Sequence, residues 1–505
     1  MLQEHLFVVK QKNTLKINRS ILLKTIFYLN WLIKKYILPQ DKNIFRAVWF
    51  LAIPVIISNL SRVLMSLVDV AMVGHLGPEA LAATGMGGML IWGALSLVLG
   101  IRTSVQTISS RRLGQNKKED CIKALNNGFL LATIYSLPIS FVGWTYGSAI
   151  IPLFINDGLT TPLAVSYFTI SSFGLFFNSI SFVFQGFYTG IEKTKVHLSV
   201  TITSNILNAY LNAGFIYGKE AIGNMFPEGL FNYIDVSWFW FWADFKGLGV
   251  TGAAIGTLIA SVWMMGHYSY YLISRPTIKK PLGFIGLGFD RSMLLKQIKL
   301  AIPMGLQETM IAVGWSFFYK IMATIGIIEL AATQLLFTIM HASFMPALGV
   351  GQACATMVGK YMGSKEIEKS EKSIIESLRI SEYIMGSMGI LFILFPEFIL
   401  SIFTSDVQII EISVWGLRLI GLMQFVDAVG FTMFLALTGA GNTLFPALVE
   451  STLIWFFMLP ASYYFGVVIK GGFKPPWVVF SIYLLLMAFI LALKVKKGDW
   501  KDIEV

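Results

Sequence analysis

The feature that most constrains this chain is a series of twelve long, predominantly apolar runs separated by short polar breaks. The runs cover residues 47–74, 80–103, 122–146, 163–190, 196–217, 248–273, 297–325, 330–358, 373–403, 411–439, 444–467 and 475–493. A helix needs about 20 residues to cross the hydrocarbon core of a bilayer. The chain is 55% hydrophobic and 13% charged, about half the charged fraction of a soluble domain. These features predict an all-α integral membrane protein and argue against a soluble enzyme or a disordered protein.

The basic residues indicate how the chain is inserted. Of 39 Lys and Arg residues, 31 fall in the termini and in alternate loops on one side of the predicted membrane, and four fall on the other side. Cytoplasmic loops are enriched in Lys and Arg, so both termini are expected in the cytoplasm, with the protein in the plasma (inner) membrane. The net charge of +11 reflects this insertion, and we expect no nucleic-acid partner. The run 21–38 predicts an interfacial amphipathic helix.

The chain repeats itself at one constant shift in residue number, which we call the repeat shift. It carries Ala52-Ile53-Pro54 onto Ala301-Ile302-Pro303, Leu81-Ala82-Ala83-Thr84 onto Leu330-Ala331-Ala332-Thr333, and Thr189-Gly190 onto Thr438-Gly439. Six runs fall on six runs, so the halves share one orientation and are related by an axis along the membrane normal. We expect two six-helix lobes, at 47–275 and 297–493, around a central cleft. A cytoplasmic linker at 276–296 joins them, and the segments 1–46 and 494–505 lie outside them.

Acidic side chains inside the runs are the first candidates for function, because a charge at membrane depth is costly. Asp69 lies in the first run, and the repeat places it opposite Phe318, so this acid belongs to one lobe. One interpretation is a site for a proton or a monovalent cation such as sodium. The alternative is structural: Arg62, seven positions earlier on the same helical face, neutralises the carboxylate. Pro54 removes a backbone hydrogen bond from this helix and predicts a hinge.

A second group of polar residues lies in the later runs. Asn205, Asn208 and Asn212 are spaced i, i+3, i+7 and face one neighbour; hydrogen bonds between helices explain such a stripe unless Asp69 is close. In the second half, Glu308 follows the equivalent proline, and Asp427 falls opposite Asn178. We interpret Glu308, Asp427 and Asn178 as a substrate site or second ion site. Pro303 is the second predicted hinge. The weaker acidic or basic candidates are Lys320, Arg418, Glu411, Glu329 and Glu450.

Some absences also matter. The sequence has no GxxxxGK[ST] loop to bind nucleotide phosphates, so transport would be driven by an ion gradient and not by ATP. His197 and His341 are isolated, and Cys121 and Cys354 lack ligand spacing, so neither a metal centre nor a disulfide is indicated. We therefore expect no cofactor and no enzymatic reaction.

Four segments in order carry a resemblance to a known family. They are LVDVAMVGHLG at 67–77, GIRTSVQTISSRRLG at 100–114, LGVGQACATMVGKYMG at 348–363 and QFVDAVGFTMFLALTGAGNT at 424–443. The chain resembles the multidrug and toxic compound extrusion (MATE) transporters from about residue 47 to 493. The resemblance implies a V-shaped, twelve-helix antiporter that exports cationic, often aromatic compounds against an inward flow of protons or sodium.

The resemblance also implies roles for particular residues. Asp69 matches the ion-binding aspartate of the first helix in the family. Asn208 and Asn212 match an Asn-xxx-Asp pair that completes this site in one branch, although Asn212 here replaces the Asp, and Thr257 matches a threonine of the same cluster. Asp427 matches the acid of the tenth helix. Glu308 lies about one turn before the position of the family's seventh-helix glutamate.

These observations favour a monomeric, ion-coupled exporter of cationic or amphipathic small molecules that works by alternating access. The alternative from the same superfamily is a lipid-linked oligosaccharide flippase, which needs a cationic cleft to hold a pyrophosphate. The acids found here disfavour that alternative. A channel or receptor is the rival from another class, and single-channel currents would identify a channel.

Overall fold

The computed structural model describes residues 38–225, 236–274 and 290–504, and these residues form helices and connecting loops without any strand. The long helices of the first half are α2 (Lys42–Gly74), α3 (Pro78–Gly114), α4 (Lys118–Ile150), α5 (Thr160–Gly190), α6 (Thr194–Met225) and α7 (Val250–Ser274). Those of the second half are α8 (Arg291–Ile325), α9 (Ile327–Gly363), α10 (Ile367–Leu394), α12 (Val407–Gly439) and α15 (Lys474–Lys497).

The remaining span, residues Leu444–Val468, is built from α13 (Leu444–Thr452), a π-helical segment η4 (Leu453–Met458), α14 (Leu459–Tyr463) and a second π-helical segment η5 (Tyr464–Val468). Its repeat counterpart α6 contains no such π-helical segments. Pro460 lies inside this span, shortly after the end of η4. The backbone nitrogen of proline carries no hydrogen and cannot donate a hydrogen bond. A π-helical segment is one way in which a helix accommodates the missing hydrogen bond.

Each of the twelve predicted runs falls on a helix, and ten helices of the described residues are long and apolar enough to cross a membrane. One prediction was wrong: run 373–403 is two helices, α10 and the short α11 (Pro396–Ser401), broken at Phe395. Proline disfavours a helical conformation in the residue before it, which explains the break. The predicted helix at 21–38 and most of the linker 276–296 lie outside the described residues. α8 begins at Arg291, before the predicted end of that linker.

The internal repeat is present in the backbone. The repeat shift carries both ends of α3 onto the ends of α9, and the start of α4 onto the start of α10. The turn after α3 contains Asn116 in a left-handed conformation (φ 59°), and the equivalent turn after α9 contains Lys365 (φ 64°). Such conformations are uncommon outside glycine. Their recurrence at equivalent positions indicates that the two halves share their turns as well as their helices.

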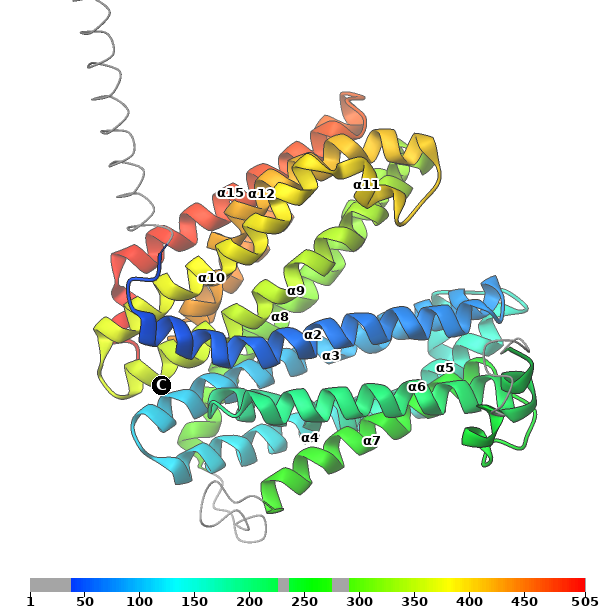
Figure 1. The fold of residues 1–505 in the computed structure, drawn as a ribbon, viewed down its shortest axis with the longest axis horizontal. Helices are drawn as coiled ribbons and strands as arrows, with labels where there is room; N and C mark the ends of the chain where they lie inside the picture. Colours follow the sequence, from blue (N-terminus) through cyan, green and yellow to red (C-terminus); the bar gives the residue numbers. More distant parts are fainter. Residues whose placement is uncertain (1–37, 226–235, 275–289, 505) are drawn as a thin grey trace, which may run out of the picture.

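The helices gather into two lobes, α2 to α7 and α8 to α15, which diverge along the length of the molecule (Figure 1). We call the end where the lobes meet the joined end; α2 begins there and α15 finishes there. Across the boundary between the lobes, α3 packs on α8 and α9, and α2 packs on α9 and α10. The first two helices of the first half and the first three of the second half therefore hold the lobes together.

Hydrogen bonds at the joined end are exchanged symmetrically between the lobes. Thr107 Oγ1 donates to the Thr438 carbonyl at 3.2 Å, and Thr356 Oγ1 donates to the Thr189 carbonyl at the same distance. Thr356 is the repeat partner of Thr107, and Thr438 is that of Thr189. The two contacts are thus copies of one another, related by the internal repeat.

Charged side chains reinforce the same boundary. Arg111 of α3 donates to the carbonyl of Ala440 in the second lobe at 3.1 Å and to that of Ile503 in the C-terminal segment at 2.8 Å. The repeat partner of Arg111 is Lys360 of α9, which forms an ion pair with Glu192 of the first lobe at 2.8 Å. Each lobe therefore extends one basic side chain to the turn that follows α5 or α12 in the other lobe.

Two glycines allow α3 and α9 to approach closely at this end. A Cβ at Gly114 would collide with the carbonyl oxygen of Lys360, and one at Gly363 would collide with that of Arg111. The two glycines are also repeat partners. The backbones meet here without intervening side chains, which holds the joined end closed in this conformation.

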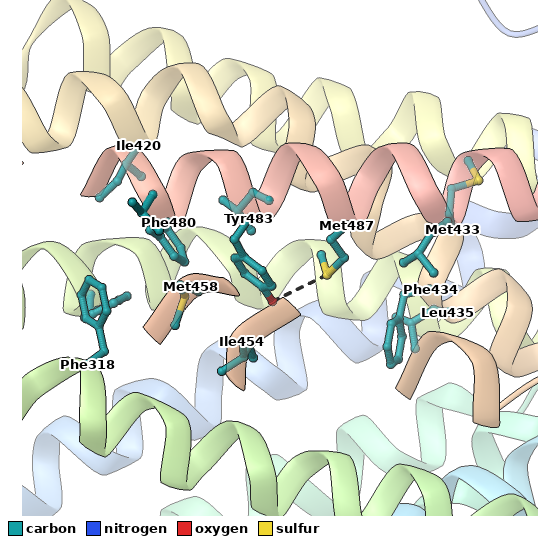
Figure 2. Close-up of a cluster of buried hydrophobic side chains, with 14 of the residues drawn as sticks. Phe318, Ile420, Met433, Phe434, Leu435, Ile454, Met458, Phe480, Tyr483 and Met487 are labelled. Carbon is teal, nitrogen blue, oxygen red and sulfur yellow. Dashed lines mark hydrogen bonds between the residues drawn. The ribbon is translucent and has the colours of Figure 1, made fainter. Parts of the chain in front are cut away.

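The largest hydrophobic core lies in the second lobe and is rich in aromatic rings. Phe318 of α8 is fully buried in it, with ring contacts to Phe337, Trp477 and Phe480 at centroid distances of 5.7, 6.1 and 6.5 Å. Figure 2 shows Phe318 and Phe480 converging from α8 and α15 on this cluster. The repeat position of Asp69 is therefore part of a packed apolar core in this lobe.

Candidate functional site

The first candidate site lies in the first lobe, where α2, α6 and α7 meet. Asp69 is near the end of α2 that is remote from the joined end and is partly exposed. Its Oδ1 accepts a hydrogen bond from Asn212 Nδ2 at 2.8 Å. Asn208 Nδ2 donates to Asn212 Oδ1 at 3.3 Å and to Thr257 Oγ1 at 3.5 Å. Thr257, Asn208 and Asn212 therefore form one hydrogen-bonded chain that ends on the carboxylate of Asp69.

Helix geometry explains how the asparagines reach their partners. Asn208 and Asn212 are four residues apart and lie on the same face of α6, and both are buried. The close approach of α7 depends on Gly256, where a Cβ would collide with Asn212 Oδ1. Asn205, one turn earlier, donates to Ser61 Oγ of α2 at 2.8 Å. The three asparagines thus form hydrogen bonds between helices, as the structural interpretation of the stripe predicts, and Asn212 also contacts Asp69.

Arg62 does not neutralise Asp69 in this conformation, which removes the structural alternative for the acid. Within the described residues, Arg62 forms no ion pair, and its guanidinium lies over the ring of Phe182 at 5.6 Å from the ring centre. Seven residues correspond to about 10 Å along a helix, and the two side chains leave α2 toward different neighbours. Asp69 is consequently the one carboxylate in its hydrogen-bonded chain, which provides a single negative charge.

The second candidate site lies in the second lobe and contains three acids. Glu450 of α13 accepts hydrogen bonds from Gln307 Nε2 at 2.7 Å and from Tyr483 OH at 3.3 Å. Glu308 follows Gln307 in α8, so the hydrogen bond from Gln307 ties its turn of the helix to Glu450, and Glu308 and Asp427 both interact electrostatically with Glu450. Figure 2 shows the Tyr483 hydroxyl pointing from α15 toward Met487, whose sulfur is 3.7 Å away. The site has an excess of acceptor oxygen atoms, a suitable environment for a cationic group.

Sequence reasoning ranked Glu450 among the weaker candidates, and the structure gives it the central place in this group. The internal repeat carries a signal for this position: Glu450 falls opposite Thr201, an acid opposite a neutral polar residue, as with Asp427 and Asn178. Asn178 itself does not join the second site. It donates to Ser261 Oγ of α7 at 2.9 Å and so belongs with the polar groups of the first lobe.

The two predicted hinges lie inside unbroken helices. Pro54 is within α2 and Pro303 is within α8. Ser58 Oγ donates to the Pro54 carbonyl at 2.7 Å, an arrangement that often accompanies a bend in a helix. Their role as hinges stays a prediction. Among the described residues there is no group of three or more His, Cys, Asp or Glu side chains with the arrangement of a metal site.

A comparison with protein families bears on this arrangement. A family model described as MatE matches the chain twice, at residues 54–213 and 303–463, one match in each lobe. The chain belongs to the MATE family. The two matches begin at Pro54 and Pro303, which are repeat partners, so the family model follows the same internal repeat.

Curated relatives from bacteria match nearly the whole chain. A protein named "Probable multidrug resistance protein NorM" from Thermotoga maritima is 26% identical over 474 residues, which is 93% of this chain and 96% of that protein. "Multidrug resistance protein MdtK" from Yersinia pseudotuberculosis is 23% identical and covers 89% of this chain and 95% of its own length. A solved structure of a multidrug resistance MATE transporter in an outward-facing conformation superposes with a TM-score of 0.80 at 20% identity, covering 91% of this chain and 97% of that one. The MATE fold is therefore shared over both lobes.

Proposed function

We propose that this protein is a secondary active antiporter that exports cationic or amphipathic compounds in exchange for protons or sodium. Its relatives carry the names of multidrug resistance proteins. The observation that carries the proposal is the hydrogen bond from Asn212 to Asp69, because it connects an acid of α2 to two other helices of the first lobe. We place the protein as a monomer in the plasma (inner) membrane, with the joined end and both termini on the cytoplasmic side.

In this mechanism Asp69 takes up the coupling ion from the outer side. A proton removes the negative charge, and a sodium ion competes for the carboxylate oxygens; either weakens the bond that Asn212 donates. The change passes along Asn208 to Thr257 and alters the packing of α2 against α6 and α7. Because α2 also packs on α9 and α10 near the joined end, a bend at Pro54 transmits the change to the second lobe.

Substrate would bind between the lobes, with its cationic group near the carboxyl groups of Glu308, Asp427 and Glu450. In the outward-facing state, ion uptake and the change in α2 would displace the substrate to the outside. The lobes would then close at the outer end and separate at the joined end, so that the ion is released to the cytoplasm after the substrate has left. The contacts that must break include the ion pair of Lys360 with Glu192. The carboxylates of the second lobe also favour this substrate class over a pyrophosphate-linked one, which argues against the flippase alternative.

The test is efflux of a cationic dye from proteoliposomes under an imposed proton gradient and then under a sodium gradient. We expect the wild-type protein to respond to at least one gradient and Asp69→Asn to lose that response. Asp120→Asn is the matched control, since Asp120 pairs with Lys123 at the start of α4 at the joined end. Gradient-driven efflux by Asp69→Asn at the wild-type rate would contradict the proposal.

A further inference from the structure

The C-terminal segment, residues 498–503, contacts both lobes at the joined end and has no role in the mechanism above. It follows α15, which ends at Lys497. Gly498 has a left-handed conformation (φ 82°), which glycine adopts without steric cost, and the next residues form a 3₁₀ turn, η6 (Asp499–Asp502). The chain therefore leaves the direction of α15 here and is free to pack on the ends of other helices.

Trp500 fixes this segment to the second lobe. Its side chain is 1% exposed and belongs to the largest hydrophobic core. Its indole nitrogen donates a hydrogen bond to the Val495 carbonyl at 2.9 Å, and the next residue, Lys501, forms an ion pair with Glu371 of α10. Burial of a large aromatic side chain contributes more than a surface ion pair does, so Trp500 is the main anchor.

The end of the same segment contacts the first lobe. Arg111 of α3 donates a hydrogen bond to the Ile503 carbonyl at 2.8 Å. The Ile503 side chain packs on a small apolar cluster in which Ile108 of α3 and Ala124 of α4 meet the start of α8. It also packs against the large core of the second lobe. Ile503 therefore lies at the boundary, with apolar groups of both lobes around it.

These contacts exist only while the joined end is closed. Separation of the lobes there would carry α3 and α4 away from α10 and α15. The segment would move with the second lobe because Trp500 is buried in that lobe, so Arg111 and Ile108 would lose their contacts with Ile503. Apolar surface would then be exposed to water and a charge-assisted hydrogen bond would be lost, and both changes disfavour separation.

We propose that the C-terminal segment is a latch that stabilises the conformation closed at the joined end. Trp500 is its fixed anchor, and the contacts of Ile503 with the first lobe are its releasable part. This inference rests on the alternating-access mechanism of the proposed function, because a latch matters only if the joined end opens. It shifts the resting population toward the closed conformation, so that opening requires free energy from ligand or ion binding.

The test measures how often the joined end opens, from labelling of a cysteine at position 110 in the full-length protein. Ser110 is fully buried, and its hydroxyl lies against Gly359 of α9 in the other lobe, so a thiol at this position reacts with a maleimide after the lobes separate. The Ser110→Cys protein keeps Cys354, which is fully buried in the core of the second lobe and reports on the fold. Mass spectrometry of the labelled peptides gives a rate for each position.

In nanodiscs without an ion gradient, Ile503→Lys should raise the labelling rate at position 110 about tenfold. It removes the apolar contact and places a second positive charge beside Arg111, and the labelling rate follows the population of the open form when opening and closing are fast. Trp500→Ala should raise the rate at least as much, since the whole segment loses its anchor. In Ile503→Lys, labelling of Cys354 should change by less than about twofold.

Asp502→Asn is the matched control, because Asp502 is the exposed neighbour of Ile503 in the same segment. It should leave the rate at position 110 unchanged, and Ile503→Leu, which keeps an apolar contact, should change it by less than about twofold. An unchanged rate at position 110 in Ile503→Lys would overturn the proposal. An equal rise at Cys354 would overturn it as well, because the segment would then be a part of the fold of the second lobe and not a latch.

This experiment uses neither a substrate nor an ion gradient, so its outcome is separate from that of the dye-efflux test. Faster labelling at position 110 in Ile503→Lys, together with a wild-type protein that shows no gradient-driven efflux, would support the latch and contradict the antiporter. Unchanged labelling in Ile503→Lys, together with gradient-driven efflux by the wild-type protein, would contradict the latch alone.

Discussion

The two lobes share one backbone plan and differ in what they place on it. Two contacts at the joined end are copies of one another: the Thr107 and Thr356 hydrogen bonds have equal lengths. The polar sites are not copies. Asp69 is replaced in the second lobe by Phe318, and the two asparagines of its chain, Asn208 and Asn212, are replaced by Phe457 and Ala461.

The other three candidate acids belong to the second lobe, and the first lobe has neutral residues at the equivalent positions. Glu308, Asp427 and Glu450 of the second lobe stand opposite neutral polar residues of the first, Asn59, Asn178 and Thr201. The two halves therefore share one scaffold and divide the charged side chains between them. The symmetric part is where the lobes meet, and the asymmetric part is where chemistry is expected, so substitutions at equivalent positions should have equal effects in the first region and unequal effects in the second.

The largest expected effect contrasts the positions of Asp69 and Phe318. Phe318→Ala should lower the free energy of unfolding by about 3 kcal/mol, because it leaves a cavity in the aromatic core. Asp69→Asn keeps an acceptor oxygen for Asn212, so the free energy of unfolding should change by less than about 1 kcal/mol. Gradient-driven transport should nevertheless be lost. Thermal unfolding in nanodiscs measures the first quantity, and equal destabilisation by both variants would contradict the proposed division between lobes.

The next effect tests the symmetry of the joined end. Gly114→Ala and Gly363→Ala each place a methyl group against a backbone carbonyl of the other lobe, and overpacking of this kind costs about 1–3 kcal/mol. Both should shift the protein away from the joined conformation to the same extent, as measured by labelling of a cysteine introduced at the boundary. Gly266→Ala, which meets no atom within 4 Å, is the control. A large effect at one glycine alone would break the symmetry.

A smaller effect concerns the acids of the second lobe. Asp427→Asn should weaken transport of cationic substrates about tenfold and of neutral ones about twofold or less, because it removes a charge that faces the substrate. Glu397→Gln in α11, where the side chain is exposed, should leave both rates unchanged. Initial efflux rates in proteoliposomes provide the comparison, and a uniform loss for both substrates would instead indicate a structural role for Asp427.

The smallest effect comes from the paired threonines. Thr107→Val and Thr356→Val each remove one hydrogen bond to a carbonyl and should each destabilise the joined conformation by about 0.5–1.5 kcal/mol. The same cysteine-labelling assay applies, with the double variant included. Unequal single effects would show that the repeat is symmetric in geometry and not in energy.

Most of the fold follows from the sequence because bilayer thickness and the internal repeat both constrain it. The twelve runs and the repeat shift locate the helices, and the errors occur where a local rule overrides hydrophobicity, as at Phe395 before Pro396. The first site was less predictable. The stripe on α6 indicates that one face is polar, but the partner across that face depends on helix packing, which no spacing within α6 encodes. Arg62 shows the same limit: its helical register matches Asp69, yet its side chain packs on Phe182.

Many bonds across the joined end are accepted by main-chain carbonyl groups, those of Thr189, Gln352, Thr438, Ala440 and Ile503. A carbonyl oxygen is present whatever side chain the residue carries, so mutations at these acceptor positions leave the bond intact provided the backbone keeps its path. The donors have no such freedom. The boundary is therefore tolerant to sequence drift on one side of each bond and sensitive on the other, which lets two halves of one ancestral unit diverge in composition while they continue to fit together.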